Sequence, residues 1–438
     1  MTLDRRQFLS TAAMSLAGTL VPGRATEAAA PTAAPAADLG DWAAVRAQFA
    51  LSPDYVHMSS FFLSSHPRPV REAIEEHRKA IDANPFLAVD RALLEQRLYG
   101  DLQPAAEYLG GKPDEIAFVP NTTTGLAFMY RGLPIKAGQE ILTTTHDHYS
   151  HHEAIRLASR QAGAVARRIA LYDDPAGASE DEIVDRVRRE IRPGTRAVGV
   201  TWVHSSTGVK LPIRRIASVL ADANRNRDED DRALLIVDGV HGFGVEDETV
   251  GQTGCDVFIS GTHKWILGPR GTGIIWAPER VWGGFSPTVP TFASLEPYSA
   301  WLTGKAPQGP SKAAWITPGG FQTYEYFWAL PAAFRFHQQL GRSRIAERIH
   351  SLNAQIKEGL GRMGHVQLHT PRGDRLSAGI VCFDVQGMKP GAVVQRLLDR
   401  SVIASETPYA PSHARLSASL VNSPDDIERA LSAVRELA

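Results

Sequence analysis

The sequence predicts an α/β fold, in which a mostly parallel sheet is flanked by helices. Short apolar runs typical of buried strands alternate along the chain with helical patterns. Five of these runs are followed directly by polar side chains suited to chemistry. Ligands of open α/β sheets bind outside the carboxyl ends of the strands, so we expect these polar residues to meet at one edge of the sheet.

The composition is that of a large globular protein. The 438 residues are 43% hydrophobic and 22% charged, which supports a sizeable core and more than one domain. The formal net charge is −1 and no basic stripe is present, so nucleic acid is not an expected partner. The two cysteines, Cys255 and Cys382, lie in apolar runs and are expected to be small buried side chains.

Residues 1–37 have the pattern of an export signal. Arg5 and Arg6 precede Phe8 and Leu9, a weakly apolar run follows, and an Ala/Pro-rich tail offers small residues for cleavage. This order resembles a twin-arginine signal, which implies the twin-arginine translocase as a partner and a periplasmic location. The apolar run is too short for stable membrane insertion. The alternative is an accidental arginine pair before a disordered tail.

The first half of the mature chain is expected to alternate helices with buried strands. Pro67 and Pro69 precede the helix expected from residue 70, and Pro85 follows its end. Gly110 sets the end of the helix expected up to residue 109. Helices are predicted over residues 41–49, 70–83, 91–109 and 216–224, and strands over 115–119, 140–144, 196–203, 234–237, 256–260 and 274–276.

The second half predicts a smaller α+β domain. Residues 282–318 are rich in Gly, Pro and aromatics and are expected to form a long connection or a loop over the site. Helices are predicted over 323–340, 344–363, 391–400 and 424–437, with strands at 379–384 and from 415. We therefore divide the chain into a signal and linker (1–37), a large domain (38–310) whose first residues are open to packing with the small domain, and a small C-terminal domain (311–438).

Lys264 stands between two apolar runs, flanked by His263 and Trp265. A lysine between buried strands is costly unless it is neutral or bonded, and one common reason for it is an imine to a carbonyl cofactor. Asp238 ends the preceding strand. A pyridine cofactor needs both groups, because the carboxylate keeps the ring nitrogen protonated while the lysine holds the aldehyde.

Thr122 and Thr123 stand where a short strand turns into a helix. Backbone N–H groups at a helix N-terminus, together with threonine hydroxyls, form a seat for an anion such as phosphate. An ordinary threonine helix cap is the alternative explanation.

Four histidines follow the next strand, at positions 146, 148, 151 and 152. Their density suggests a metal site, although no HExxH pattern or cysteine pair accompanies them. The alternative is that His148 or Tyr149 packs a flat ring against an aromatic cofactor.

From about residue 55 to the C-terminus, these motifs together resemble the class V aminotransferase family. This family of fold-type-I pyridoxal 5'-phosphate (PLP) enzymes includes cysteine desulfurases, kynureninase and isopenicillin N epimerase. The resemblance implies PLP as cofactor, a small-molecule substrate and a homodimer.

The resemblance also implies roles for individual residues. Lys264 is expected to be the Schiff-base lysine, Asp238 to pair with the pyridinium nitrogen and His241 to lie near the phenolic oxygen. Arg415 matches the family's arginine for the substrate α-carboxylate. The remaining expected cofactor contacts are Thr122, Thr123, His263 and Ser260 at the phosphate, Ser205 or Ser206 at the ring oxygen, and His148 or Tyr149 stacked on the ring.

Two departures from the family pattern narrow the expected activity. Phe321 stands where the family often has the threonine that reaches the partner subunit's phosphate, with Gln322 as a possible replacement. The stretch 401–414 contains no cysteine, which argues against a cysteine desulfurase. Transamination, epimerisation, elimination or decarboxylation at an amino acid's α-carbon is expected instead.

The export signal adds a resemblance to exported class V enzymes that tailor pyoverdine-type siderophores, which implies an amino-acid or siderophore-precursor substrate. The competing hypothesis is a periplasmic metal-binding or interaction protein on the same scaffold. It would use His146, His148, His151 and His152.

Overall fold

The structure is a computed structural model that describes residues 39–95 and 97–438. The predicted signal and linker, residues 1–37, lie outside the described residues, so export stays a prediction. Within the described part of the chain, no helix has both the length and the apolar character needed to cross a membrane.

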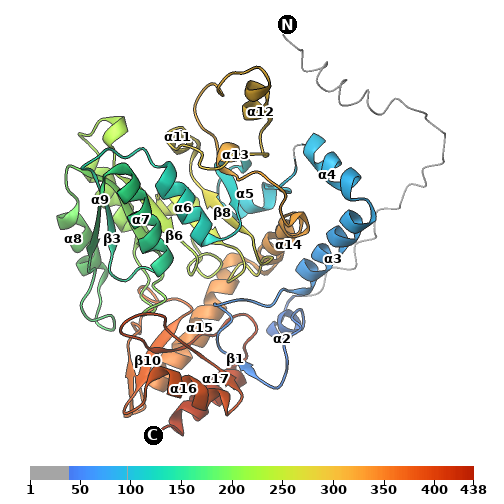
Figure 1. Cartoon of the computed structure of the whole chain (residues 1–438). Coiled ribbons are helices and arrows are strands. Elements are labelled where there is room, and N and C mark those ends of the chain that lie inside the picture. Colours follow the sequence, from blue (N-terminus) through green and yellow to red (C-terminus); the bar gives the residue numbers. More distant parts are fainter. Residues whose placement is uncertain (1–38, 96) are drawn as a thin grey trace. The chain divides into compact units, whose positions relative to one another are not determined.

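A seven-stranded sheet forms the centre of the fold, in the order β2-β8-β7-β6-β5-β3-β4 (Figure 1). Only β8 runs antiparallel to its neighbours. Every residue of β2, β3, β5, β7 and β8 is buried, which explains the near-continuous apolar runs in the sequence. The predicted α/β class with a mostly parallel sheet is confirmed. The strands are β2 (Ile116–Val119), β3 (Glu140–Thr144), β4 (Val165–Ile169), β5 (Thr195–Thr201), β6 (Leu234–Asp238), β7 (Val257–Gly261) and β8 (Gly273–Trp276).

Helices cover both faces of this sheet. Leu126 and Ile155 pack with Ala197 of β5 in one apolar cluster. Ile183 and Ile216 belong to a second cluster with the next residue of β5, Val198, whose side chain points to the opposite face. The helices on the first face are α6 (Thr122–Gly132) and α7 (Tyr149–Ala162), and those on the second are α8 (Glu180–Glu190) and α9 (Ile213–Ala223).

The C-terminal part forms a separate four-stranded antiparallel sheet, in the order β12-β13-β10-β9. Val381, Phe383 and Val385 of its central strand pack with apolar residues of the surrounding helices, which Figure 1 shows around β10. Its strands are β9 (Val366–Leu368), β10 (Val381–Val385), β12 (Ser405–Glu406) and β13 (Ala414–Leu416), and its helices are α15 (Arg342–Leu360), α16 (Pro390–Leu398) and α17 (Pro424–Arg435).

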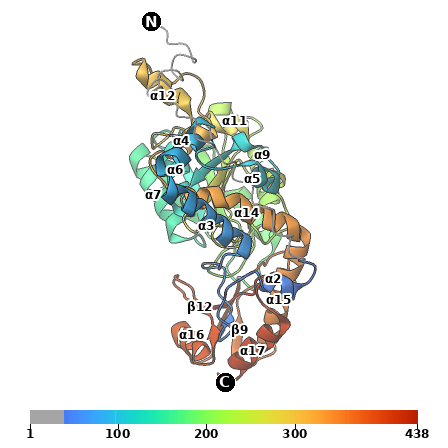
Figure 2. The same ribbon diagram turned by 90° about the vertical axis from the view of Figure 1, so that its right-hand side faces the viewer.

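The remaining elements connect these two sheets. β1 (Val56–His57) pairs in parallel with β11 (Val402–Ile403), and so ties the first part of the described chain to its C-terminal part. In both views α3 lies beside α14 (Figure 2). The division into two domains at residue 310 stays a prediction. The other helices are α2 (Trp42–Arg46), α3 (Arg68–Ala83), α4 (Pro85–Leu94), α5 (Gln103–Leu109), α10 (Val250–Thr253), α11 (Glu279–Trp282), α12 (Leu295–Leu302), α13 (Ala313–Ile316) and α14 (Tyr324–Leu340).

Some predicted boundaries are wrong. The single helix expected over residues 91–109 is two helices, α4 and α5, because the chain turns through Gly100 at φ +90° between them. Pro85 both follows α3 and begins α4, since proline is well suited to the first helical turn. The connection 282–318 is not wholly irregular, because α12 and α13 lie within it.

Candidate active site

Lys264 follows β7 and turns its side chain toward the end of β6. Its Nζ lies 3.2 Å from Nε2 of His241, and the side chain is mostly buried. Burial lowers the pKa of this amine, the Asp238 carboxylate opposes that shift, and Arg415 adds to it. The net direction is downward, toward the neutral amine that can attack a carbonyl group.

Asp238 is the last residue of β6 and is 3% exposed. Among the described residues its carboxylate has one hydrogen-bond donor, the backbone N–H of Val240 at 3.1 Å. Burial raises the pKa of this carboxyl, while the Val240 N–H and the charge of Lys264 oppose the rise. A protonated ring nitrogen would therefore give the buried carboxylate a partner that the polypeptide does not supply.

His241 connects these groups and has a defined protonation state. Its Nδ1 accepts from Nε1 of Trp265 at 3.4 Å, and an indole nitrogen can only donate. Burial and the charge of Lys264 hold the pKa of His241 well below its ordinary value, so the ring is neutral and carries its proton on Nε2. That proton points toward Lys264 Nζ, 3.2 Å away, which can accept it when the amine is neutral. The ring also lies 5.7 Å from the ring of Phe61.

A cradle forms where α6 begins beside the end of β7. Thr122 is buried, and its Oγ1 accepts from the N–H of Gly261 at 2.7 Å. A Cβ added at Gly261 would lie 2.7 Å from Cε1 of His263, so glycine allows these groups to meet. Thr123 is exposed on the first turn of α6, whose N-cap is Asn121. Free N–H groups at this helix start suit a phosphate.

Ser260 bonds the backbone next to this cradle. It is fully buried, and its Oγ donates to the carbonyl of Gly261 at 2.9 Å. The hydroxyl is thus committed to the backbone.

His148 and Tyr149 separate at the start of α7. The ring of His148, the N-cap residue, bonds Ser150 through Nδ1 and lies edge-on to Tyr409 at 6.0 Å. Burial and the charge of Lys264 lower the pKa of His148. Tyr149 is 73% exposed and turns away from these groups. Of the two predicted rings, only His148 lies at the site.

Arg415, on β13 of the small sheet, is 5% exposed. Its guanidinium donates to the carbonyls of Ser205 at 3.0 Å and Glu406 at 2.7 Å, and to Oγ of Ser405 at 3.2 Å. It also lies over the ring of Phe61, at 4.8 Å. Within the described residues, no carboxylate forms an ion pair with it.

Ser205 and Ser206 lie on the loop after β5. The hydroxyl of Ser205 bonds the hydroxyl of Tyr409 at 2.8 Å, while Ser206 donates to the carbonyl of His146 at 3.3 Å. Tyr409 was not predicted from the sequence. It lies between β12 and β13 of the small sheet, in a segment where the only feature noted in the sequence is the lack of cysteine.

With this geometry in view, comparison with known proteins identifies the family. The family profile "Aminotransferase class-V" matches residues 67–421. The chain belongs to the class V aminotransferase family. It is 27% identical over 416 residues to an isopenicillin N epimerase of Amycolatopsis lactamdurans, which covers 90% of this chain and 98% of the relative. A probable cysteine desulfurase of Pyrococcus abyssi is 22% identical, covering 90% and 96%.

Solved structures agree on the fold. A C-DES mutant with glycine covalently linked to its PLP cofactor superposes with a TM-score of 0.76 at 21% identity, covering 89% of this chain and 99% of that one. The apo cysteine desulfurase of Thermococcus onnurineus NA1 also gives 0.76, at 23% identity and with 90% and 97% coverage. The fold is that of fold-type-I PLP enzymes, and the predicted fold, enzyme class and cofactor are confirmed.

The site fits PLP on its own geometry. The Gly261 cradle leaves no room for a side chain, the Asp238 carboxylate accepts only from the Val240 N–H among the described residues, and the lysine pKa is shifted toward the neutral form. Asp238 and Gly261 end the adjacent strands β6 and β7, the edge at which open α/β sheets bind their ligands.

Among the described residues, the histidine run of this class V chain does not form a cluster of metal ligands. His146 stacks on Tyr172 with ring centroids 3.9 Å apart, His151 bonds the hydroxyl of Tyr130 at 2.7 Å, and His152 bonds the carbonyl of Thr144 at 2.7 Å. His148 faces the active site instead. The proposed metal-binding function of this cluster therefore has no geometric support.

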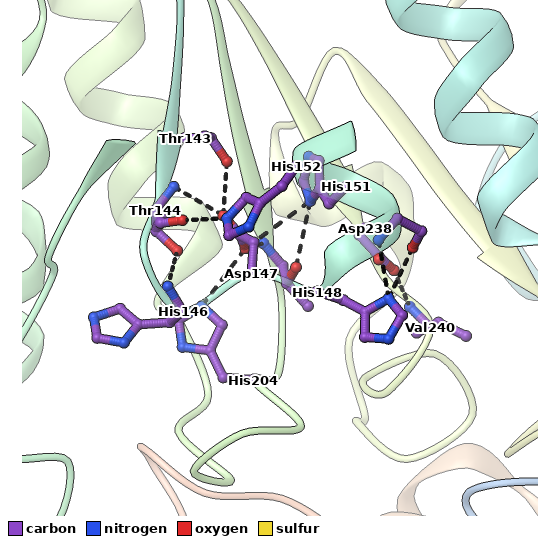
Figure 3. Close-up of polar contacts among 12 residues, drawn as sticks. Thr143, Thr144, His146, Asp147, His148, His151, His152, His204, Asp238 and Val240 are labelled. Carbon is purple, nitrogen blue, oxygen red and sulfur yellow. Dashed lines mark hydrogen bonds and ion pairs between the residues drawn. The ribbon is translucent and has the colours of Figure 1, made fainter. Parts of the chain in front are cut away.

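Asp147, within the same run, organises the region and was missed in the sequence (Figure 3). Its buried carboxylate accepts from Thr143 Oγ1, Thr144 N and Thr201 N, each at 2.8 Å. These bonds tie the end of β3 to the end of β5, and so fix the loop that carries His148.

The predicted substitute for the family's cross-subunit threonine lies apart from these groups. Phe321 is 88% exposed, and the Gln322 amide donates to the carbonyl of Gly319 at 3.4 Å. A role for Gln322 in a partner subunit's site stays a prediction.

Proposed function

We propose that this class V enzyme acts at the α-carbon of an amino acid or of a peptide-borne amino group. Bound PLP supplies an electron sink for the negative charge that develops at that carbon. The observation that carries the proposal is Arg415, a buried cation without a carboxylate partner in the described chain, close enough to Lys264 to lower its pKa. A substrate α-carboxylate is the anion that fits it.

Each residue then has a role that follows from its position. Lys264 would hold the cofactor aldehyde and, through Nζ, move the proton at the substrate α-carbon. Asp238 would keep the ring nitrogen protonated, and His241 would offer its Nε2 proton to the phenolic oxygen. Thr122, Gly261 and the α6 N-terminus bind the phosphate.

His148 and Tyr409 complete the proposed site. The His148 ring, edge-on to Tyr409, would pack on one face of the cofactor, and the Ser205 hydroxyl, which bonds Tyr409, would serve the ring oxygen. Phe61 packs against His241 and Arg415, so it would help these side chains to keep water from the reacting carbon.

Persulfide chemistry is not part of this proposal, although several relatives are named as probable desulfurases. Cys382 lies opposite Arg415 in the sheet but is fully buried, and burial raises its pKa to about 12. Such a thiol is a poor nucleophile. Since two isopenicillin N epimerases are relatives over nearly their full length, epimerisation is the first reaction to assay. A Cys255→Ser/Cys382→Ser double variant should keep its activity, and loss of activity in folded protein would support a cysteine route.

The location and assembly are also proposals. The leader supports export to the periplasm, where a siderophore precursor is the candidate substrate. Substituting Arg5→Lys and Arg6→Lys should retain the protein in the cytoplasmic fraction. Exposed Phe62, Phe86, Leu87 and Phe321 support a homodimer, which light scattering would test.

The central test locates the cofactor on the chain. Borohydride reduction of the holoenzyme fixes PLP to its lysine, and peptide mass spectrometry should find it on Lys264. Lys264→Ala should lose the visible band of lysine-bound PLP and, with it, essentially all activity. A reduced adduct on another lysine, or a Lys264→Ala protein with an unchanged band, would refute the proposal.

A further inference from the structure

His369, Asp384 and His413 form a cluster that the proposed reaction does not use. Asp384 lies on the central strand β10, His369 directly follows β9, and His413 directly precedes β13. Phe383 pairs with both Leu368 and Ala414, so the antiparallel register puts Asp384 across from His413 and diagonal to His369. All three side chains therefore project from one face of the sheet, opposite the face on which Phe383 packs.

The potential ligand atoms of this cluster lie close together. Nε2 of His369 is 2.8 Å from Oδ2 of Asp384, and Nδ1 of His413 is 3.0 Å from both carboxylate oxygens. All the atoms lie within 4.8 Å of one another. Four-coordinate zinc holds its ligand atoms about 3.3 Å apart, given bonds of about 2.0 Å, so small outward movements would admit an ion.

We propose that His369, Asp384 and His413 bind a first-row divalent metal ion, with Zn²⁺ as the first candidate. Two imidazoles and one carboxylate are ligands that suit Zn²⁺ and its neighbours rather than Mg²⁺ or Ca²⁺. The Asp384 side chain is 34% exposed, against 13% and 10% for His369 and His413, so the cluster opens to solvent on the aspartate side. Water can enter there and complete the coordination.

The site has a structural link to the active centre. Arg415 pairs with Cys382 across β10 and β13, so it projects from the same face as the cluster. The loop that carries Tyr409 is closed at its base by His413, whose N–H donates to Thr407 Oγ1 at 2.9 Å and whose carbonyl accepts from Thr407 N at 2.8 Å. An ion on His413 would therefore anchor the loop that brings Tyr409 to Ser205.

The alternative is a hydrogen-bonded triad in which Asp384 accepts from both rings and no ion binds. Metal titration separates the two. PLP-loaded, full-length mature protein is dialysed against chelator, freed of it, and titrated with Zn²⁺ by calorimetry and with Co²⁺ by visible absorption. We expect one high-affinity ion per chain, with Co²⁺ bands typical of low coordination number.

Variants assign the ion to the cluster. Asp384→Asn and His369→Asn should each weaken Zn²⁺ binding by more than about 100-fold, since even outer-shell changes cost 10- to 100-fold. His365→Asn is the matched control, because its ring bonds the carbonyl of Val434 outside the cluster, and it should bind Zn²⁺ as the wild type does. Circular dichroism establishes that each variant is folded.

Absence of a one-to-one Zn²⁺ or Co²⁺ complex in the wild-type protein would by itself overturn the proposal and favour the triad. If the Asp384→Asn protein failed to fold, a folded His369→Asn protein that bound Zn²⁺ with wild-type affinity would also overturn the proposal. The readout is metal binding and needs no turnover, so its failure leaves the PLP proposal unaffected.

Discussion

At the scale of single residues, the guanidinium of Arg415 is held entirely by neutral oxygens. It donates to one hydroxyl and two carbonyls, and Phe61 covers its face. Burial lowers the pKa of Arg415, which reflects the unfavourable removal of its charge from water. A substrate carboxylate would offset this by adding a charged partner in a prearranged geometry.

Replacing Arg415 with lysine should therefore impair carboxylate recognition. Lysine keeps the charge but cannot reproduce the planar fork, so we expect kcat/KM for an α-amino acid to fall by roughly 10- to 100-fold, the equivalent of one hydrogen bond to a charged group. Steady-state kinetics with an amino acid and with its decarboxylated amine would measure this. An equal loss for the amine would contradict carboxylate binding, because the amine has nothing for the fork to hold.

Lys264 and Asp238 could be predicted as site residues from the sequence because both interrupt apolar runs. Asp238 ends a buried strand and Lys264 follows one three residues later, and a charged side chain at such a place is costly unless it is paired. Asp147 could not be singled out in this way, because its neighbours in the sequence are histidines and other polar residues rather than an apolar run. The choice between His148 and Tyr149 depended on where α7 begins, and one residue of helix phase decides which ring faces inward.

At the scale of elements, the end of β7 meets the start of α6 at a position that excludes any side chain. Gly261 donates to Thr122, and His263 folds back over its Cα. The contact brings the phosphate seat and the lysine loop together, because β7 ends at Gly261 and Lys264 follows three residues later.

Gly261→Ala should thus weaken cofactor binding. The new methyl would overlap His263 and approach Thr122 Oγ1 at 3.2 Å, and relieving such overpacking costs about 1–3 kcal/mol, or roughly 5- to 150-fold in the PLP dissociation constant. Fluorescence titration of apo protein with PLP is the measurement. Gly364→Ala, where a Cβ has open space, is the control. Equal affinities for wild type and Gly261→Ala would show that the cradle does not hold the phosphate.

The order and direction of the strands could not be predicted from the sequence. The apolar runs located β2, β3, β6 and β7, but a fully buried run reads the same in either direction, so antiparallel β8 could not be distinguished. Helix α7 begins within the histidine run and was obscured by it. The break between α4 and α5 depends on the left-handed turn at Gly100, which a helical pattern alone does not reveal.

At the scale of the whole molecule, the site draws on both sheets. The large sheet supplies Asp238 and Lys264, and the small sheet supplies Arg415, which reaches across to the carbonyl of Ser205. Residues more than 200 positions apart are thus brought together by the packing of two sheets, and no local pattern could predict their distances. Such a site requires the surrounding core to stay folded, and buried histidines make that core sensitive to acid.

His337, on α14, offers a clear test of this acid sensitivity. It is fully buried, and burial lowers its pKa from the ordinary 6.5 to about 3. Its Nδ1 contacts the hydroxyl of Tyr108 at 3.2 Å. Between these two pKa values the unfolded chain binds a proton that the folded chain does not, so folding stability decreases as pH falls below 6.5 and is fully present above it.

His337→Asn should therefore flatten the pH dependence of unfolding. In urea denaturation of holoenzyme between about pH 5 and pH 6, the wild-type free energy of unfolding should change more steeply than the variant's by about 1.4 kcal/mol per pH unit, the value for one proton. Tyr108→Phe is the control, because it removes the same contact and keeps the imidazole, and it should retain the wild-type slope. Parallel slopes for wild type and His337→Asn would mean that His337 is protonated in the folded state. In that case, interactions within the core would offset the free-energy cost of burying the charged ring.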